Sequence, residues 1–232
     1  MAGDKEETPR ATCPITGRGG KVDVPPLEER QKPAEGQRMP LATRRVVSSI
    51  PKPAEGASNG GESLPEETPT CPAGHGDAGG SWEYPSEQMF YNAMKRKGWD
   101  PREEDMRATV QLHNAVNERA WGEVLKWERE LHCDECEHPR LKTFRGRPTD
   151  LSPKALLMGM LGYARPFDRH DWTVDRCGKD VRYVIDFYGG DMRRASSGKG
   201  VAMHLDTRPA LDSPGAVWDR MRMWARRTFF TS

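Results

Sequence analysis

One histidine stands on the apolar side of a predicted long helix. At about 100° per residue, the helix expected over residues 101–130 places His113 on one stripe with mostly apolar neighbours. These neighbours are Met106, Val110, Asn117, Ala120, Val124 and Trp127. Spacing alone favours a core histidine whose ring is satisfied by Asn117 or by a backbone carbonyl. The alternative is an axial ligand to haem iron, which requires a neutral imidazole in an apolar, aromatic slot. Four aromatic residues precede the helix and can supply such a slot: Trp82, Tyr84, Phe90 and Tyr91.

A second histidine lies among charged residues. His170 is the centre of the string Asp-Arg-His-Asp-Trp at residues 168–172. An imidazole beside two carboxylates can hold a proton or act as a ligand. Spacing alone favours the alternative, a cluster of salt bridges at the start of a strand. The chain has no glycine-rich phosphate loop, nucleophile elbow or paired-acid hydrolase pattern, so no other catalytic class is indicated.

Two of the five cysteines each precede a proline. Proline keeps the backbone after Cys13 and Cys71 extended, and an exposed thiolate in this setting can ligate ferric haem. Short Cys-Pro motifs of this kind occur in haem-responsive proteins. The alternative is that both are incidental cysteines of a disordered segment.

Cys133 and Cys136 have the Cys-x-x-Cys spacing of zinc ligands, and His132 and His138 flank them. No second pair follows, and four ligands within seven residues would be cramped. A loop with free thiols is therefore preferred over a zinc site. The odd number and irregular spacing of the cysteines argue against a disulfide framework, so we expect reduced thiols.

Composition narrows the class of protein that carries these residues. Lys and Arg number 36 and Asp and Glu 35, a net charge of +1, which gives no long-range attraction to nucleic acid or to anionic lipid. The longest run of apolar residues and glycine, residues 155–163, is far shorter than the roughly 20 residues of a spanning helix. We therefore expect a soluble or peripheral protein. The acidic N-terminus resembles neither a secretory signal nor an Arg-rich presequence.

The chain divides near residue 81 into a tail and a body. Residues 1–81 contain no Trp, Tyr or Phe, but 11 of the 19 prolines and 12 of the 23 glycines. Such a segment buries too little apolar area to offset its chain entropy, so we expect it to be mostly disordered. Residues 82–232 hold all seven tryptophans and are expected to form a single catalytic domain.

The body is predicted to have an α+β fold. Serine N-caps and prolines at the first turn predict helices that begin after Ser86, Ser152 and Ser213, beside the long helix described above. Alternating apolar residues predict a strand over 181–188, paired with residues 170–176, and a third strand near 201–205. Helices followed by a small antiparallel sheet indicate the α+β class.

Long strings of the body resemble the holocytochrome c synthase (cytochrome c-type haem lyase) family. In order, they lie at residues 82–94, 97–99, 112–121, 126–128, 162–163, 166–172, 176–178, 181–188, 208–213 and 217–221. The resemblance covers essentially all of 82–232, and the Cys-Pro motifs with residues 48–51 extend it into the tail. Long strings in a fixed order are far more specific than any single motif above.

The resemblance implies a lyase that attaches haem covalently to apocytochrome c, cytochrome c1 or both. Two thiols of the substrate's Cys-x-x-Cys-His motif add across the haem vinyl groups, which gives two thioether bonds. It further implies a protein of the mitochondrial intermembrane space, bound peripherally to the inner membrane. The competing hypotheses are a non-catalytic haem sensor that uses the Cys-Pro motifs, and an interaction module stabilised by zinc.

The resemblance also assigns roles to residues by position. His113 corresponds to the family's ligand of haem iron, and Trp82 and Tyr84 to its haem-contacting region. His170 is the family's second histidine, so His113 and His170 are the predicted catalytic residues. Cys13 and Cys71 match the Cys-Pro motifs as candidate haem contacts, although Ile15 and Ala73 replace the frequent valine. The histidines beside Cys133 and Cys136 are not part of the pattern.

Overall fold

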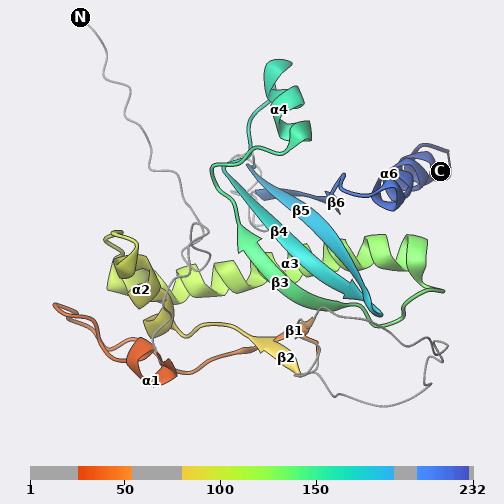
Figure 1. The fold of residues 1–232 in the computed structure, drawn as a ribbon. Helices are drawn as coiled ribbons and strands as arrows, with labels where there is room; N and C mark the ends of the chain where they lie inside the picture. The colour runs from red at the N-terminus through yellow and green to blue at the C-terminus, as the bar shows by residue number, and fades with distance from the viewer. Residues whose placement is uncertain (1–25, 54–79, 191–202, 230–232) are drawn as a thin grey trace, which may run out of the picture.

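A computed structural model describes residues 26–53, 80–190 and 203–229 (Figure 1). The helices are α1 (Leu27–Arg30), α2 (Glu87–Arg96), α3 (Met106–His132), α4 (Pro153–Met160) and α6 (Pro214–Phe229), with a 3₁₀ turn at Glu103–Asp105. The strands are β1 (Val47–Pro51), β2 (Ser81–Glu83), β3 (Arg140–Gly146), β4 (Asp168–Arg176), β5 (Lys179–Gly189) and β6 (Met203–Pro209). This is the α+β fold that the sequence predicted.

Four strands form an antiparallel sheet in the order β3-β4-β5-β6. The β4–β5 hairpin turns through Cys177 and Gly178, both at positive φ, which is the backbone of a two-residue type I′ turn. Trp172 pairs with Tyr183 across the hairpin, and both side chains are buried on the face that α3 covers. The predicted strand pair is therefore confirmed.

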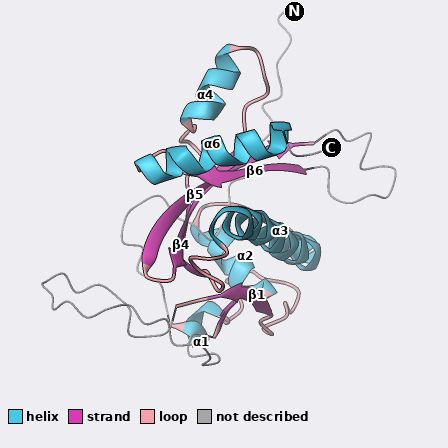
Figure 2. Ribbon diagram, turned by 90° about the vertical axis from the view of Figure 1, so that its right-hand side faces the viewer, coloured by secondary structure: helices cyan, strands magenta, loops and turns pink. Residues whose placement is uncertain are grey.

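Helix α3 runs along the sheet and supplies the other half of the core (Figures 1 and 2). Its apolar stripe of Ala120, Val124 and Trp127 packs on the sheet, as the period of 3.6 residues requires. Nearer its start, Met106 and Val110 pack on α2 in a second cluster. One helix therefore spans both apolar clusters.

Residues 26–53 differ from the disordered tail that their composition predicted. β1 pairs antiparallel with β2, and Ile50, only 2% exposed, joins the main core. Asn92 of α2 donates its amide to the carbonyls of Arg30 and Lys32. These contacts use backbone groups, which need partners whatever the side chains are, so a lack of aromatic residues does not prevent them. Cys13 and Cys71 lie outside the described residues.

Cys136 and Cys177 form a disulfide, so the expectation of reduced cysteines is wrong for this pair. The turn after α3 carries Cys136, and the β4–β5 turn brings Cys177 beside it from 41 residues away. Cys133 is an exposed free cysteine. Zinc at Cys133 and Cys136 is not supported, because the bonded sulfur of Cys136 cannot act as a thiolate ligand. Within the described ranges no cluster of three or more His, Cys, Asp or Glu could hold a metal ion.

Two further elements were not predicted in full. β3 lacks a clear apolar alternation and was missed, and α3 begins at Met106, after a 3₁₀ turn rather than at residue 101. In the part of the chain that the structure describes, no helix is long and apolar enough to cross a bilayer.

Candidate functional site

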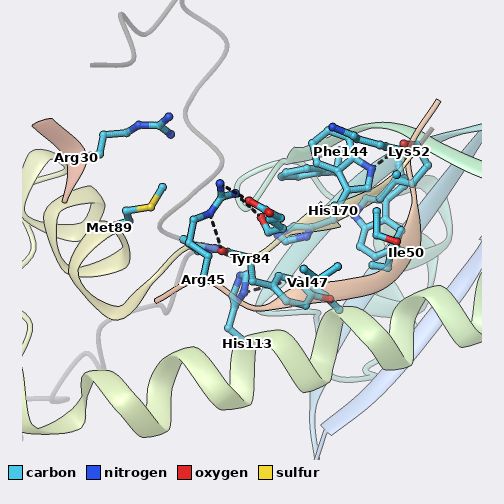
Figure 3. Close-up of a pocket in the computed structure, with 18 residues that line it drawn as sticks. Arg30, Arg45, Val47, Ile50, Lys52, Tyr84, Met89, His113, Phe144 and His170 are labelled. Carbon is cyan, nitrogen blue, oxygen red and sulfur yellow. Dashed lines mark hydrogen bonds and ion pairs between the residues drawn. The ribbon is translucent and has the colours of Figure 1, made fainter. Parts of the chain in front are cut away.

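A cavity of about 710 Å³ lies between the two sheets and the first half of α3 (Figure 3). Its size is within the range of roughly 300–1,000 Å³ that holds small-molecule and cofactor ligands. Its wall contains four of the residues that the sequence singled out: His113, His170, Trp82 and Tyr84. The structure thus brings together side chains from α3, β4 and β2 that are far apart in the sequence.

A second cavity of about 260 Å³ adjoins the first. Both cavities are bordered by His113, Asn117 and His170. Most of the remaining wall of the second cavity is apolar, with Phe90 and Phe187 among its aromatic residues. The two histidines therefore stand between a larger, partly cationic space and a smaller, apolar one.

His113 is half-buried and points away from α3 into the larger cavity (Figure 3). The edge of its ring meets Phe90, with 5.2 Å between the centroids. Its Nδ1 lies 3.2 Å from Nδ2 of Asn117, one turn along the helix. Because a side-chain amide can be turned by 180°, Asn117 can also accept a hydrogen bond from a protonated Nδ1. In that tautomer Nε2 carries the lone pair that a metal ion requires.

His170 is 5% exposed on β4, deeper than His113. Its Nε2 lies 3.2 Å from a carboxylate oxygen of Asp168, and its ring packs edge-on against Phe187 at 5.0 Å. The neighbouring Arg169 and Asp171 form a bidentate ion pair, as the salt-bridge alternative anticipated. A carboxylate at this distance suits an imidazole that holds or passes a proton, so the geometry gives the two histidines different surroundings.

Tyr84 is held by the carboxylate of Glu118, which is one residue beyond Asn117 on α3. The phenol donates to Oε1 of Glu118 at 2.9 Å. Burial, and then this hydrogen bond, raise the pKa of Tyr84 above its ordinary value. Glu118 also accepts hydrogen bonds from the backbone amide and the hydroxyl of Ser49 on β1. Glu118 therefore ties the β1–β2 sheet to α3 and keeps Tyr84 a neutral donor at the cavity wall.

Trp82 is fixed by one polar and one aromatic contact. Its indole Nε1 donates to the carbonyl of Leu141 at 2.8 Å. Its ring meets Phe144 of β3 edge-on, with 5.3 Å between the centroids. The unpredicted strand β3 thus provides the support for a predicted site residue.

Three cationic side chains line the same cavity, and sequence reasoning missed all of them: Arg30, Arg45 and Lys52. Arg45 forms an ion pair of 2.5 Å with Glu83 and donates to the carbonyl of Tyr84. Arg30 extends from α1 beside Met89 (Figure 3), and its Nε is buried without a hydrogen-bond partner among the described residues. Composition placed all three residues in the tail. The family-like string at 48–51 was the one signal from which a structured segment there could have been predicted.

His132 and His138, which flank Cys133 and Cys136, do not line either cavity. His132 is buried at the end of α3, where it contacts Asp219 at 2.9 Å and Glu135 at 3.1 Å. His138 is exposed. Cys133 is not part of either cavity wall. These residues belong to the opposite end of α3.

The walls fit a flat, largely apolar ligand that carries a metal ion and carboxylates. Aromatic side chains supply apolar faces, an imidazole supplies a metal ligand, and arginine and lysine complement carboxylate charge. Haem has all of these features. The predicted roles of His113, His170, Trp82 and Tyr84 remain predictions, but the structure places all four in one wall that fits this ligand.

Comparisons with known proteins agree on one family. Residues 55–224 match the family model described as cytochrome c/c1 heme lyase. A holocytochrome c-type synthase of Gallus gallus is 43% identical over 229 residues, which cover 93% of this chain and 74% of the relative. A putative holocytochrome-c1 synthase of Schizosaccharomyces pombe is 42% identical over 203 residues, 86% and 84% of the two chains. The Homo sapiens holocytochrome c-type synthase is 41% identical over 230 residues, 93% and 75% of the two chains. No solved structure matches.

Proposed function

The chain belongs to the cytochrome c/c1 heme lyase family, and from that premise we infer that it is a lyase that attaches haem covalently to apocytochrome c. The observation that carries this function is the cavity in which His113, His170, Trp82 and Tyr84 meet. We further propose that the thiols of a Cys-x-x-Cys-His motif are the groups that react. Relatives named for cytochrome c and for cytochrome c1 are both similar to this chain, so either is a candidate substrate.

The addition itself is redox-neutral. Each substrate sulfur bonds to one carbon of a haem vinyl group, and the thiol proton ends on the other carbon. Because the substrate supplies both nucleophiles, the enzyme needs no nucleophile of its own. Both substrate thiols must be reduced, since a disulfide has no S–H to add.

The contribution of the enzyme is therefore orientation. Holding reacting groups in the right geometry can replace a large part of an activation barrier, of the order of 7–11 kcal/mol in favourable cases. In the proposed complex, Nε2 of His113 binds iron on one side and Asn117 fixes the tautomer through Nδ1. The substrate's own histidine takes the other side and sets the register of its two cysteines.

The cavity wall also distinguishes one edge of the haem from the other. Arg30 provides positive charge for a propionate and Arg45 is already paired with Glu83, whereas the vinyl groups are apolar. This asymmetry directs the propionate edge of the haem to the cationic wall and leaves the vinyl edge for the substrate thiols. Trp82 and Tyr84 add an aromatic face and a neutral donor to the same side of the site.

We also propose the location that the family resemblance implies, the intermembrane space of mitochondria, with peripheral binding to the inner membrane. A haem-attaching enzyme must meet its apoprotein before that substrate folds. The resemblance of the body supports the location, and the surface described in the next subsection supports membrane contact.

The test of the activity is co-expression in bacteria with apocytochrome c and without any other maturation factor. We expect haem that stays on the substrate through a denaturing gel. A substrate in which serine replaces both cysteines of its motif is the matched control and should carry none. If the normal substrate also emerges without covalent haem while both proteins are soluble, the proposed function is wrong.

A further inference from the structure

Two helices at one side of the molecule expose apolar side chains that no described part of the protein covers. On and after α4 these side chains are 50–70% exposed, and on α6 they are 44–68% exposed. They are Leu156, Leu157, Met160, Leu161 and Tyr163 from the first group and Val217, Trp218, Met221, Trp224 and Phe229 from the second. Several exposed apolar side chains gathered on two helices usually mark an interaction site.

Helix α6 has two apolar sides, whereas an ordinary amphipathic helix has one. Its inner side packs on the core through Ala216 and Met223. At about 100° per residue, Trp218, Met221 and Trp224 fall on the opposite side. Arg222 lies on a flank between the two sides. Arg220, Arg226 and Arg227 lie nearer the inner side, where they contact the Pro209 carbonyl, the Glu130 carbonyl and the Trp127 ring. Core packing accounts for the inner stripe and leaves the outer one without a partner.

Helix α4 contributes almost nothing to the core. Ala155 is its one buried residue. Its start is anchored to the sheet, since the hydroxyl of Ser152 donates to Asp186 at 2.6 Å and Lys154 pairs with Asp206 at 2.7 Å. Beyond this anchor the helix projects away from the sheet, on the same side of the molecule as α6 (Figures 1 and 2). Its exposed leucines and methionine therefore serve no purpose in the fold.

The charge of this surface is one-sided. Residues 153–165 and 214–229 contain six basic residues and one acidic residue, Asp219. Asp219 is buried against His132 and Lys154 is paired with Asp206, so the net positive charge of this surface comes from its arginines. Arg226 touches the rest of the protein through the backbone carbonyl of Glu130, which does not neutralise its charge.

We propose that α4 and α6 form a membrane-docking face that binds the surface of an anionic lipid bilayer. Tryptophan and tyrosine favour the level of the headgroups, and arginines on the flanks of an apolar stripe extend toward phosphates while their stems stay in the apolar layer. A symmetric contact between two copies is disfavoured because it would bring the same arginines together. The inference deepens, and rests on, the membrane association proposed above, and it is independent of the haem cavity.

The test is flotation of the full-length protein with two kinds of vesicle, pure phosphatidylcholine and an equal mixture with phosphatidylglycerol. We expect the wild-type protein to float with the anionic vesicles.

Two double variants test the apolar side chains, Trp218→Asp with Trp224→Asp on α6 and Leu157→Asp with Met160→Asp on α4. Each should lower the partition coefficient at least about tenfold. Arg222→Gln with Arg226→Gln should reduce the preference for anionic vesicles. Met39→Asp, at a residue 50% exposed and outside both cavities, is the matched control and should float like the wild type.

Haem attachment in solution is measured on the same variants, because neither cavity includes the substituted residues. We expect unchanged attachment and unchanged thermal unfolding. Failure of the wild type to float on either vesicle would overturn both the association and the face. Aspartate variants that float like the wild type would overturn the face alone. If the aspartate variants lose haem attachment, the face formed by α4 and α6 is a substrate-docking surface instead. If the wild-type protein is a dimer and the aspartate variants are monomers, the face is a contact between two copies of the chain.

Discussion

Helix α3 passes through two regions that differ in how their polar side chains are buried and paired. Toward its end, Glu128 is 1% exposed, and both of its oxygens accept hydrogen bonds from Arg176 while one also accepts from Tyr183. Near its middle, His113 and Asn117 are only half-buried and border two cavities. The first region is a closed ionic network, and the second is open to a ligand.

The difference shows that a buried or perturbed titratable group does not by itself mark a functional site. Burial raises the pKa of Tyr183 just as it raises the pKa of Tyr84, and each phenol contacts a glutamate of α3. Tyr84 lines the larger cavity, whereas Tyr183 is in the wall of neither of the two cavities described above. Access for a ligand, rather than the raised pKa, separates the proposed haem site from the structural network.

The largest expected effect is on the closed network. Glu128→Ala leaves Arg176 and Tyr183 buried without their partner, so the free energy of unfolding should fall by about 3–5 kcal/mol. Chemical denaturation measures the loss. Glu123→Ala, which removes only a surface ion pair of the same helix, should change stability by less than about 0.5 kcal/mol. A Glu128 variant of normal stability with altered haem binding would reverse the assignment of the two regions.

The next effect concerns the disulfide, which lies at the closed end. Replacing Cys136 and Cys177 by serine should cost about 2–4 kcal/mol, because the bond closes a loop of 41 residues in the unfolded chain. Haem affinity and attachment by the folded protein should change less than tenfold. Cys133→Ser is the control and should leave stability as it is. A stable double variant that attaches no haem would place a thiol in the reaction.

A smaller effect is expected at the edge of the cavity. Arg30→Met should weaken haem binding about tenfold, because it removes a charge available to a propionate. Haem dimethyl ester, which lacks both carboxylates, should bind the variant and the wild type equally well. The exposed Arg44→Met should bind haem normally. Equal losses of haem and of its ester in the Arg30 variant would mean a general distortion of the cavity.

The smallest effect is expected at Tyr84. Because its pKa is raised above the ordinary value of 10.0, the phenol stays protonated through neutral pH, and we expect it to act as a hydrogen-bond donor rather than as a phenolate ligand. The absorption spectrum of bound haem should therefore show no tyrosine transition between about pH 7 and 10. Tyr84→Phe should keep that spectrum and cost about 1 kcal/mol of stability. A pH-dependent band that disappears in the Phe variant would make Tyr84 a ligand.

Sequence patterns predicted the elements that depend on near neighbours. Ser86 and Ser152 each accept the N-cap hydrogen bond, from Met89 and Ala155, that their positions before helices implied. The strand alternation between Val181 and Phe187 appears as β5. In each case the decisive contacts lie within a few residues or follow from one periodic pattern.

The features that were missed depend on distant partners. Glu128 and Arg176 are 48 residues apart, and the cysteines of the disulfide 41. β1 is stabilised by pairing with β2, which no property of its own sequence reveals. For His113, helical spacing placed the residue correctly, but the neighbours that make its surroundings a cavity come from β1, β2 and β4.

The central claim is that haem binds in this cavity with His113 as its protein ligand. Absorption spectra of the haem complexes of wild type, His113→Ala and His170→Ala test it most directly. His113→Ala should lose the histidine-ligated spectrum and nearly all attachment, and added imidazole should restore the spectrum by occupying the vacated space. His113→Met should keep some haem with a changed spectrum, since a thioether is also an axial donor. His170→Ala should keep the spectrum and lose only activity. A wild-type spectrum in His113→Ala together with its loss in His170→Ala would contradict the account.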